Sequence, residues 1–279
     1  GAIVGEGQLL TRRDVGERVD EVLSLRTAAN LDLGDRSQPL DLEALDFVIL
    51  KEGVKGLSYQ PQVPMYGVQD LHYFAVSGVS DVGEGEYEAS NLVISGAPYT
   101  LPLKETFAKA GNAYGFWAAE GEGWGYQNQY AGVTYSTDED ANGDGGCADI
   151  KTYYEDVVAL VSGKIALGSA EKPMFMYSQK TDSKEGSVRP LVIKADGTRE
   201  YLATESLDGY ADAGKWVSRS YDLSAYKGQE WIRVGVAFDQ SKRSYRNQHL
   251  YIDNFVVADE TPKSITVSVS APAKMRKGK

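Results

Sequence analysis

Three strand-like runs near the C-terminus, the first two of them alternating, constrain the fold of this 279-residue chain more than any other feature. Residues 216–223 and 231–238 have the length and composition of β-strands, and Lys227-Gly228 between them predicts a turn. The third run, 250–257, contains the pair Asp253-Asn254. Short strands with glycine-containing turns favour a sandwich or barrel over alternating strand and helix units. We therefore predict an all-β protein.

Similar strand patterns occur throughout the chain and divide it into two large units and a tail. Residues 1–96 form the first unit, and residues 97–260 form the second. Two prolines and a glycine in residues 96–102 predict a linker at the boundary. Residues 261–279 are predicted to be a tail that contains the first strand of a further domain. Predicted strands cover residues 22–26, 45–51, 71–79, 90–94, 157–165, 174–177 and 188–193, in addition to the three runs above.

The first unit resembles a fibronectin type III domain. Residues 73–77, the Gly-Glu-Gly turn at 83–85 and Ala89-Ser90-Asn91 resemble the last two strands of that family and the turn between them. The resemblance implies a β-sandwich, of which residues 22–26 and 47–50 are earlier strands. The tryptophan and proline that are usual in the early strands are missing here.

The second unit resembles the jelly-roll domains called cleaved-adhesin, MAM-like or choice-of-anchor J domains. The resemblance rests on Pro102, Glu105 and Phe107, on residues 159–167, on the block 216–228 and on Ile252-Asp253-Asn254. It implies a segment of a secreted or cell-surface protein of Bacteroidetes-like bacteria, associated with the outer membrane. It also implies two tandem β-sandwich domains, with other domains of the same polypeptide as partners. Because the chain begins at Gly1 without a signal peptide, we expect it to be a fragment of a longer protein.

The charge of the chain limits its partners. With 40 acidic and 29 basic residues the net charge is −11, which disfavours nucleic acid and anionic membranes. An acidic surface is compatible with a glycan, a host surface protein or a divalent cation as the ligand. The alternative is that the excess carboxylates only keep the protein soluble. No apolar run approaches the roughly 20 residues of a membrane span, so we predict no membrane insertion.

Residues 138–149 carry the sharpest local motif, an acidic loop with a glycine at its sixth position. A hard cation such as Ca²⁺ is held by six to eight oxygen atoms, which alternate side chains of such a loop supply. The alternative is a solvated turn, because aspartate, asparagine and glycine are common turn formers. The predicted calcium ligands are Asp138, Asp140, Asn142, Asp144 and Asp149.

The resemblance to jelly rolls implies a second structural calcium site, between the first and last strands of the second unit. Its carboxylates would be Glu105 and Asp253. The alternative for Asp253 is a side chain that accepts hydrogen bonds from the backbone at a strand end.

Exposed aromatic side chains stack on sugar rings or anchor a protein partner. The glycine-rich stretch 120–126 predicts a surface loop, and we expect Trp124, Tyr126 and Tyr130 to bind a ligand. Aromatic residues of a β-sandwich also pack in its core, and we expect this of the tryptophans at positions 117, 216 and 231.

The sequence carries no recognisable catalytic motif: it has no Gly-x-Ser-x-Gly, no His-Glu-x-x-His and no phosphate-binding glycine loop followed by lysine. The single cysteine, Cys147, has no histidine-based partner in a known motif, so we expect a small buried residue. We predict a non-catalytic binding segment with structural calcium. The alternative is an accessory region of a secreted protease or glycosidase whose catalytic domain lies outside this chain.

Overall fold

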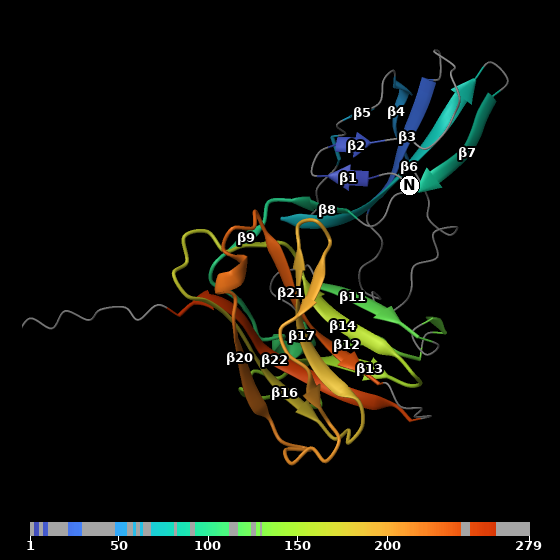
Figure 1. Cartoon of the computed structure of the whole chain (residues 1–279). Coiled ribbons are helices and arrows are strands. Elements are labelled where there is room, and N and C mark those ends of the chain that lie inside the picture. The colour runs from blue at the N-terminus through green and yellow to red at the C-terminus, as the bar shows by residue number, and fades with distance from the viewer. Residues whose placement is uncertain are drawn as a thin grey trace, which may run out of the picture.

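The structure is a computed structural model, and it confirms an all-β protein (Figure 1). It describes residues 3–5, 8–10, 22–29, 48–54, 58–59, 62–63, 68–80, 83–89, 93–111, 117–123, 127–128, 130–240 and 246–260. Within these residues the elements are strands and two 3₁₀ helices, η3 (Ala108–Ala110) and η4 (Ser224–Tyr226). No helix in this part of the chain is long and apolar enough to cross a membrane.

Two sheets come from the N-terminal third of the chain and lie at the top of Figure 1. The three-stranded sheet contains β1 (Ile3–Gly5), β2 (Gln8–Leu10) and β5 (Ser58–Tyr59). The five-stranded sheet contains β4 (Val48–Val54), β3 (Val22–Ala29), β6 (Gln69–Ser80), β7 (Gly83–Ala89) and β8 (Val93–Gly96). The predicted strands at 22–26 and 71–79 are present and extend further than the pattern indicated. Membership of the fibronectin type III family stays a prediction.

The rest of the described chain forms a β-sandwich of two larger sheets. The six-stranded sheet contains β12 (Gly132–Ser136), β13 (Cys147–Thr152), β22 (Gln248–Asp259), β16 (Pro173–Thr181), β20 (Val217–Asp222) and β10 (Leu103–Glu105). The eight-stranded sheet contains β11 (Trp117–Glu122), β14 (Val157–Ser162), β21 (Ile232–Asp239), β15 (Ile165–Ala166), β9 (Tyr99–Thr100), β17 (Ser187–Lys194), β18 (Arg199–Tyr201) and β19 (Glu205–Ser206).

The core of the sandwich lies between these two sheets. Along β16 buried and partly exposed residues alternate, as expected of a strand with one face on the core. Its Phe175 packs against Phe255 of β22, with ring centroids 4.7 Å apart. Val158, Leu160, Val234 and Val236 approach the same core from the opposite sheet.

The two strands predicted at 216–223 and 231–238 do not form a hairpin. β20 belongs to the six-stranded sheet and β21 to the eight-stranded sheet, so the chain between them crosses from one sheet to the other. Leu223 and Tyr226, in this connection, are buried against the core. The sequence pattern located both strands but not the sheet that each one joins.

The segment predicted to be a linker takes part in a sheet. β9 pairs with β15 in parallel, Ile165 opposite Tyr99. Gln69, the first residue of β6, donates its side-chain amide N–H to the carbonyl oxygen of Lys164 (2.8 Å) and accepts the Lys164 backbone N–H (2.7 Å). These contacts fasten the five-stranded sheet to the sandwich.

Candidate functional site

The central strands β21 and β14 of the eight-stranded sheet are buried on both faces. On β21 all eight residues are buried, and on β14 five of six are. Because neighbouring residues of a strand point to opposite faces, one set reaches the sandwich core and the other set lies on the outer face. The register aligns that second set across the strands: Ala159 lies opposite Ala237, and Gly235 lies opposite both Val161 and Leu191. The outer face therefore has a floor of small and apolar residues.

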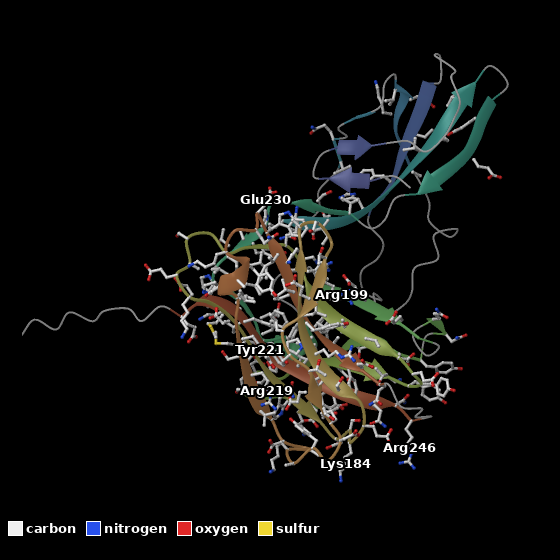
Figure 2. The ribbon with its side chains drawn as sticks, in the orientation of Figure 1. Lys184, Arg199, Arg219, Tyr221, Glu230 and Arg246 are labelled. Atoms are coloured by element: carbon white, nitrogen blue, oxygen red, sulfur yellow. The ribbon has the colours of Figure 1, made fainter. Side chains whose placement is uncertain are left out.

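Side chains from distant strands meet over this floor. Arg199 of β18 forms an ion pair with Glu120 of β11. Three strands, β14, β21 and β17, separate β11 from β18, so in a flat sheet the two backbones would lie about 19 Å apart, at about 4.8 Å per strand. Two side chains bridge that span only if the sheet bends toward them. We call this outer surface the concave face. In Figure 2 Arg199 lies beside β11.

Arg233 of β21 lies at the centre of the concave face and is 7 % exposed. Its Nε donates to the carbonyl oxygen of Ser162 (2.8 Å), and its Nη1 donates to Oε1 of Glu120 (2.8 Å). Its Nη2 is buried without a hydrogen-bond partner. Burial lowers the pKa of Arg233, Glu120 raises it and Arg199 lowers it further. An arginine remains protonated despite such shifts, so two cations share one carboxylate here.

A second cluster continues the concave face beside the first. Arg189 of β17 forms an ion pair with Asp239 of β21. The guanidinium carbon of Arg189 lies 5.2 Å from the ring centroid of Tyr201, at the distance of a cation–π contact. The Tyr201 side chain is among the few large hydrophobic residues that are exposed, at 43 %. The concave face thus combines an accessible aromatic ring, charged hydrogen-bonding groups and an apolar floor.

The acidic loop predicted to bind calcium connects β12 to β13. Asp140 Oδ1 accepts the backbone N–H groups of Asn142 (2.8 Å) and Gly143 (2.6 Å), and its Oδ2 accepts that of Gly145 (2.6 Å). The N–H of Gly145 and then that of Gly143 are the main causes that lower the pKa of Asp140. This carboxylate organises the loop through amide groups.

Asp253 attaches the acidic loop to β22. Its Oδ2 accepts the backbone N–H of Ala141 (2.8 Å), and its Oδ1 accepts that of Asn254 (2.5 Å). The side-chain amide of Asn142 donates to Oδ1 of Asn254 (2.9 Å). Burial raises the pKa of Asp253, while the two amide bonds lower it.

The other predicted calcium ligands have separate partners. Asp144 accepts the side-chain amide of Asn142 at Oδ2 (3.1 Å), and its Oδ1 is buried without a partner. A carboxylate oxygen of Asp149 lies 2.9 Å from Nδ1 of His249. Glu105 accepts the backbone N–H of Phe107 (2.9 Å). Asp138 is exposed.

The residues of this loop do not form a cation cage in the present conformation. Among the described residues no three His, Cys, Asp or Glu side chains converge as a metal ion requires. Several of the carboxylate oxygens proposed as ligands accept backbone amides instead. Calcium binding stays a prediction.

None of the three aromatic residues predicted to bind a ligand is among the residues of the concave face named above. Trp124 and Tyr126 are outside the described residues, as is the side chain of Trp117. Tyr130 is exposed and stacks on Tyr153, with centroids 5.2 Å apart. Trp216 and Trp231 are partly buried rather than in the core.

Cys147 is fully buried, as expected of a small apolar residue. Burial, followed by the nearby charge of Asp149, raises the pKa of its thiol to about 12. The thiol is therefore protonated at neutral pH and is a poor nucleophile.

Sequence reasoning missed the charged residues of the concave face. One signal was present: Arg233 lies inside an apolar run whose two faces are both buried, and a charge in such a strand needs a partner. Nothing in the sequence indicates that Glu120 and Arg199 are those neighbours, because they are 113 and 34 residues away along the chain.

No family model and no curated protein matches the sequence. Solved structures similar to the chain include carbohydrate-binding modules of the β-sandwich superfamily, at 12% identity over 92% of this chain and 96% of that chain, with a TM-score of 0.43. The K1 cleaved adhesin domain of Lys-gingipain from Porphyromonas gingivalis W83 is 13% identical over 57% of this chain and 99% of that chain, with a TM-score of 0.42. A xylan-binding domain from Paenibacillus barcinonensis is 15% identical over 56% of this chain and 92% of that chain, with a TM-score of 0.37. A likeness of this degree assigns the chain to no family.

Proposed function

We propose that this chain is a non-catalytic, glycan-binding segment of a larger secreted or cell-surface bacterial protein, and that the concave face is its ligand site. The observation that carries the proposal is the exposed ring of Tyr201, held by Arg189 beside charged groups and above an apolar floor.

The chemistry of a sugar fits this combination. A pyranose ring presents C–H groups that pack on an aromatic face and hydroxyl groups that exchange hydrogen bonds with charged side chains. Arg189 and Asp239 supply a donor and an acceptor next to Tyr201. The ion pair holds the donors in place before the ligand arrives, which limits the entropy lost on binding.

A structural calcium ion at the acidic loop is part of the same proposal. Two features support it: the loop is rich in carboxylates, and Oδ1 of Asp144 is buried without a partner. To bind the cation, the carboxylates of Asp140 and Asp253 would release the backbone N–H groups that they now accept. The bound ion would stiffen the connection between β12 and β13.

The test compares two exposed tyrosines. Tyr201→Ala removes the ring on the concave face, and Tyr130→Ala removes the ring that the sequence pointed to. Binding of the 279-residue chain and both variants to a glycan panel is measured, followed by titration calorimetry with the members that bind. We expect Tyr201→Ala to weaken binding about tenfold or more, since burial of a large apolar side chain contributes about 1.5–3 kcal/mol.

Tyr130→Ala is expected to leave the dissociation constant unchanged. If Tyr130→Ala abolishes binding and Tyr201→Ala does not, the ligand binds at the end of the sandwich and the concave face is not the site. Wild-type protein that binds no member of the panel contradicts the proposed function itself.

A further inference from the structure

We infer that the glycan bound on the concave face carries an anionic group, a carboxylate or a sulfate, and that Arg199 and Arg233 bind it. This inference rests on the proposed function and specifies the class of ligand. It follows from the charge balance of the cluster formed by Arg199, Arg233 and Glu120, from a donor without a partner and from the exposure of the two arginines.

The charge balance of the cluster is positive. Arg199 and Arg233 both bind Glu120, so three charged groups leave a net charge of +1 in a chain whose net charge is −11. Removing a cation from water costs free energy unless an anion nearby compensates its charge. Within the described residues the acidic group that shifts the pKa of Arg233 is Glu120 alone. One more negative group would neutralise the cluster.

The donor without a partner is Nη2 of Arg233. The other two nitrogens of this guanidinium each make a hydrogen bond of 2.8 Å. A buried N–H without an acceptor loses its hydration without replacement. An oxygen of a carboxylate or sulfate satisfies this N–H and forms a charge-assisted bond, which is shorter and stronger than a neutral one.

The exposure of the side chains indicates the path of entry. The side chain of Arg199 is 34 % exposed and that of Glu120 is 26 % exposed, against 9 % for Arg233. Arg199 therefore forms the outer part of the cluster, and the ligand meets it before it meets Arg233. The anionic group competes with Glu120 for Arg199 and, once Arg199 turns, reaches Nη2 of Arg233.

If the ligand competes with Glu120, two substitutions should change the affinity for anionic glycans in opposite directions. Arg199→Gln removes one of the two cations and is expected to weaken binding of anionic glycans at least about tenfold. Glu120→Gln removes the competing carboxylate while its amide oxygen still accepts a hydrogen bond from Arg233. We expect it to strengthen binding of anionic glycans.

The control is Arg246→Gln, which makes the same substitution at an exposed arginine. Figure 2 shows Arg246 at the opposite end of the sandwich from Arg199. Thermal melting of each variant shows whether it is folded. Because Arg199 is partly exposed, its substitution tests the inference even where Glu120→Gln fails to fold.

The measurement is titration calorimetry with three groups of glycans: uronate-bearing, sulfated and neutral oligosaccharides. Carboxyl-reduced forms of the uronate-bearing members provide matched neutral ligands. Tighter binding of uronate-bearing or of sulfated members, lost in Arg199→Gln and retained in Arg246→Gln, supports the inference, and the group that binds identifies the source of the anion.

Two results overturn the inference while glycan binding itself is retained. If neutral members bind as tightly as anionic ones, the site has no preference for an anion, although the proposed function stands. If Arg199→Gln leaves binding of anionic members intact, the anion binds elsewhere. Absence of binding to all three groups contradicts the proposed function together with the inference.

Discussion

Arg233 is the residue that gives the concave face its chemistry. Its strand is buried on both faces, so a charged side chain at this position cannot reach bulk water and must find its partners within the protein. Ser162 and Glu120 satisfy two of its nitrogens. The third stays without a partner, and a buried polar group in this state requires a specific explanation.

Gly235, two residues further along β21, is required by the packing of the floor. A Cβ atom at this position would lie 2.5 Å from the carbonyl oxygen of Leu160 and 3.1 Å from Cα of Val161. Both atoms belong to the backbone of the neighbouring strand and cannot move aside. The absence of a side chain here is therefore a matter of space.

Asp140 illustrates why the acidic loop was read as a calcium site. Aspartate and asparagine at alternate positions coordinate a cation, and the same residues accept backbone N–H groups in a turn. In the structure Asp140 does the second. The sequence supplied both interpretations and no means of choosing between them.

Asp140→Asn is predicted to destabilise the protein at neutral pH. Asparagine has one acceptor oxygen, so it cannot accept amides on both sides as the carboxylate does. The pKa of Asp140 is lowered in the folded state, so its contribution to stability is present above its unfolded value of about 3.9. That contribution is lost as the pH falls through the folded pKa.

Urea denaturation at pH 7 and near pH 2.5 checks this prediction. The free energies of unfolding of wild type and Asp140→Asn should differ at pH 7 and converge at the acid pH. Asp138→Asn is the matched control, because the Asp138 side chain is exposed. A difference between wild type and Asp140→Asn that is the same at both pH values would contradict the assigned role of the carboxylate.

At the scale of elements, the local pattern located strands and could not assign them to sheets. The runs at 174–177, 188–193 and 250–257 became β16, β17 and β22, each extended at both ends. β11, β12 and β13 were not predicted, because small, polar and charged residues leave each of them without a sustained apolar pattern. β11 pairs with β14, β13 pairs with β22 and β12 pairs with β13, and this pairing supplies the stability that their own propensities do not.

The contact between β6 and the turn after β14 is an element-scale feature that the sequence did not indicate. Gln69→Ala removes both hydrogen bonds to the backbone of Lys164, and it leaves a buried N–H and C=O with fewer partners. We expect a loss of about 1–3 kcal/mol in the free energy of unfolding. Faster hydrogen exchange of the Lys164 amide is also expected.

Hydrogen exchange followed by mass spectrometry, together with denaturant unfolding, checks this prediction. Gln229→Ala is the control, because Gln229 is exposed. Unchanged exchange at Lys164 in Gln69→Ala would mean that the two hydrogen bonds do not fasten β6 to the sandwich.

At the scale of the whole molecule, calcium binding is the expectation that is most open to test. The acidic loop is joined to β22 through Asp253, so a cation bound there would link two distant segments of the chain. A ligand that binds only the folded state raises the melting temperature. We expect a higher melting temperature in millimolar calcium than in a chelator, and a smaller difference in Asp253→Asn.

Magnesium is the control for a general ionic effect, because it demands a stricter octahedral geometry. Equal melting temperatures with calcium and with a chelator would exclude structural calcium at both predicted sites. The loop would then be stabilised by the hydrogen bonds between its carboxylates and backbone N–H groups, without a cation.

The sequence by itself determined the all-β class and the positions of several strands, because alternation and glycine-containing turns act over a few residues. The tertiary structure alone decided which sheet each strand joins and which residues meet on the concave face. Glu120 lies 79 residues from Arg199 and 113 from Arg233 along the chain. Their contact depends on long-range strand pairing and on the bend of an eight-stranded sheet, which no local pattern records.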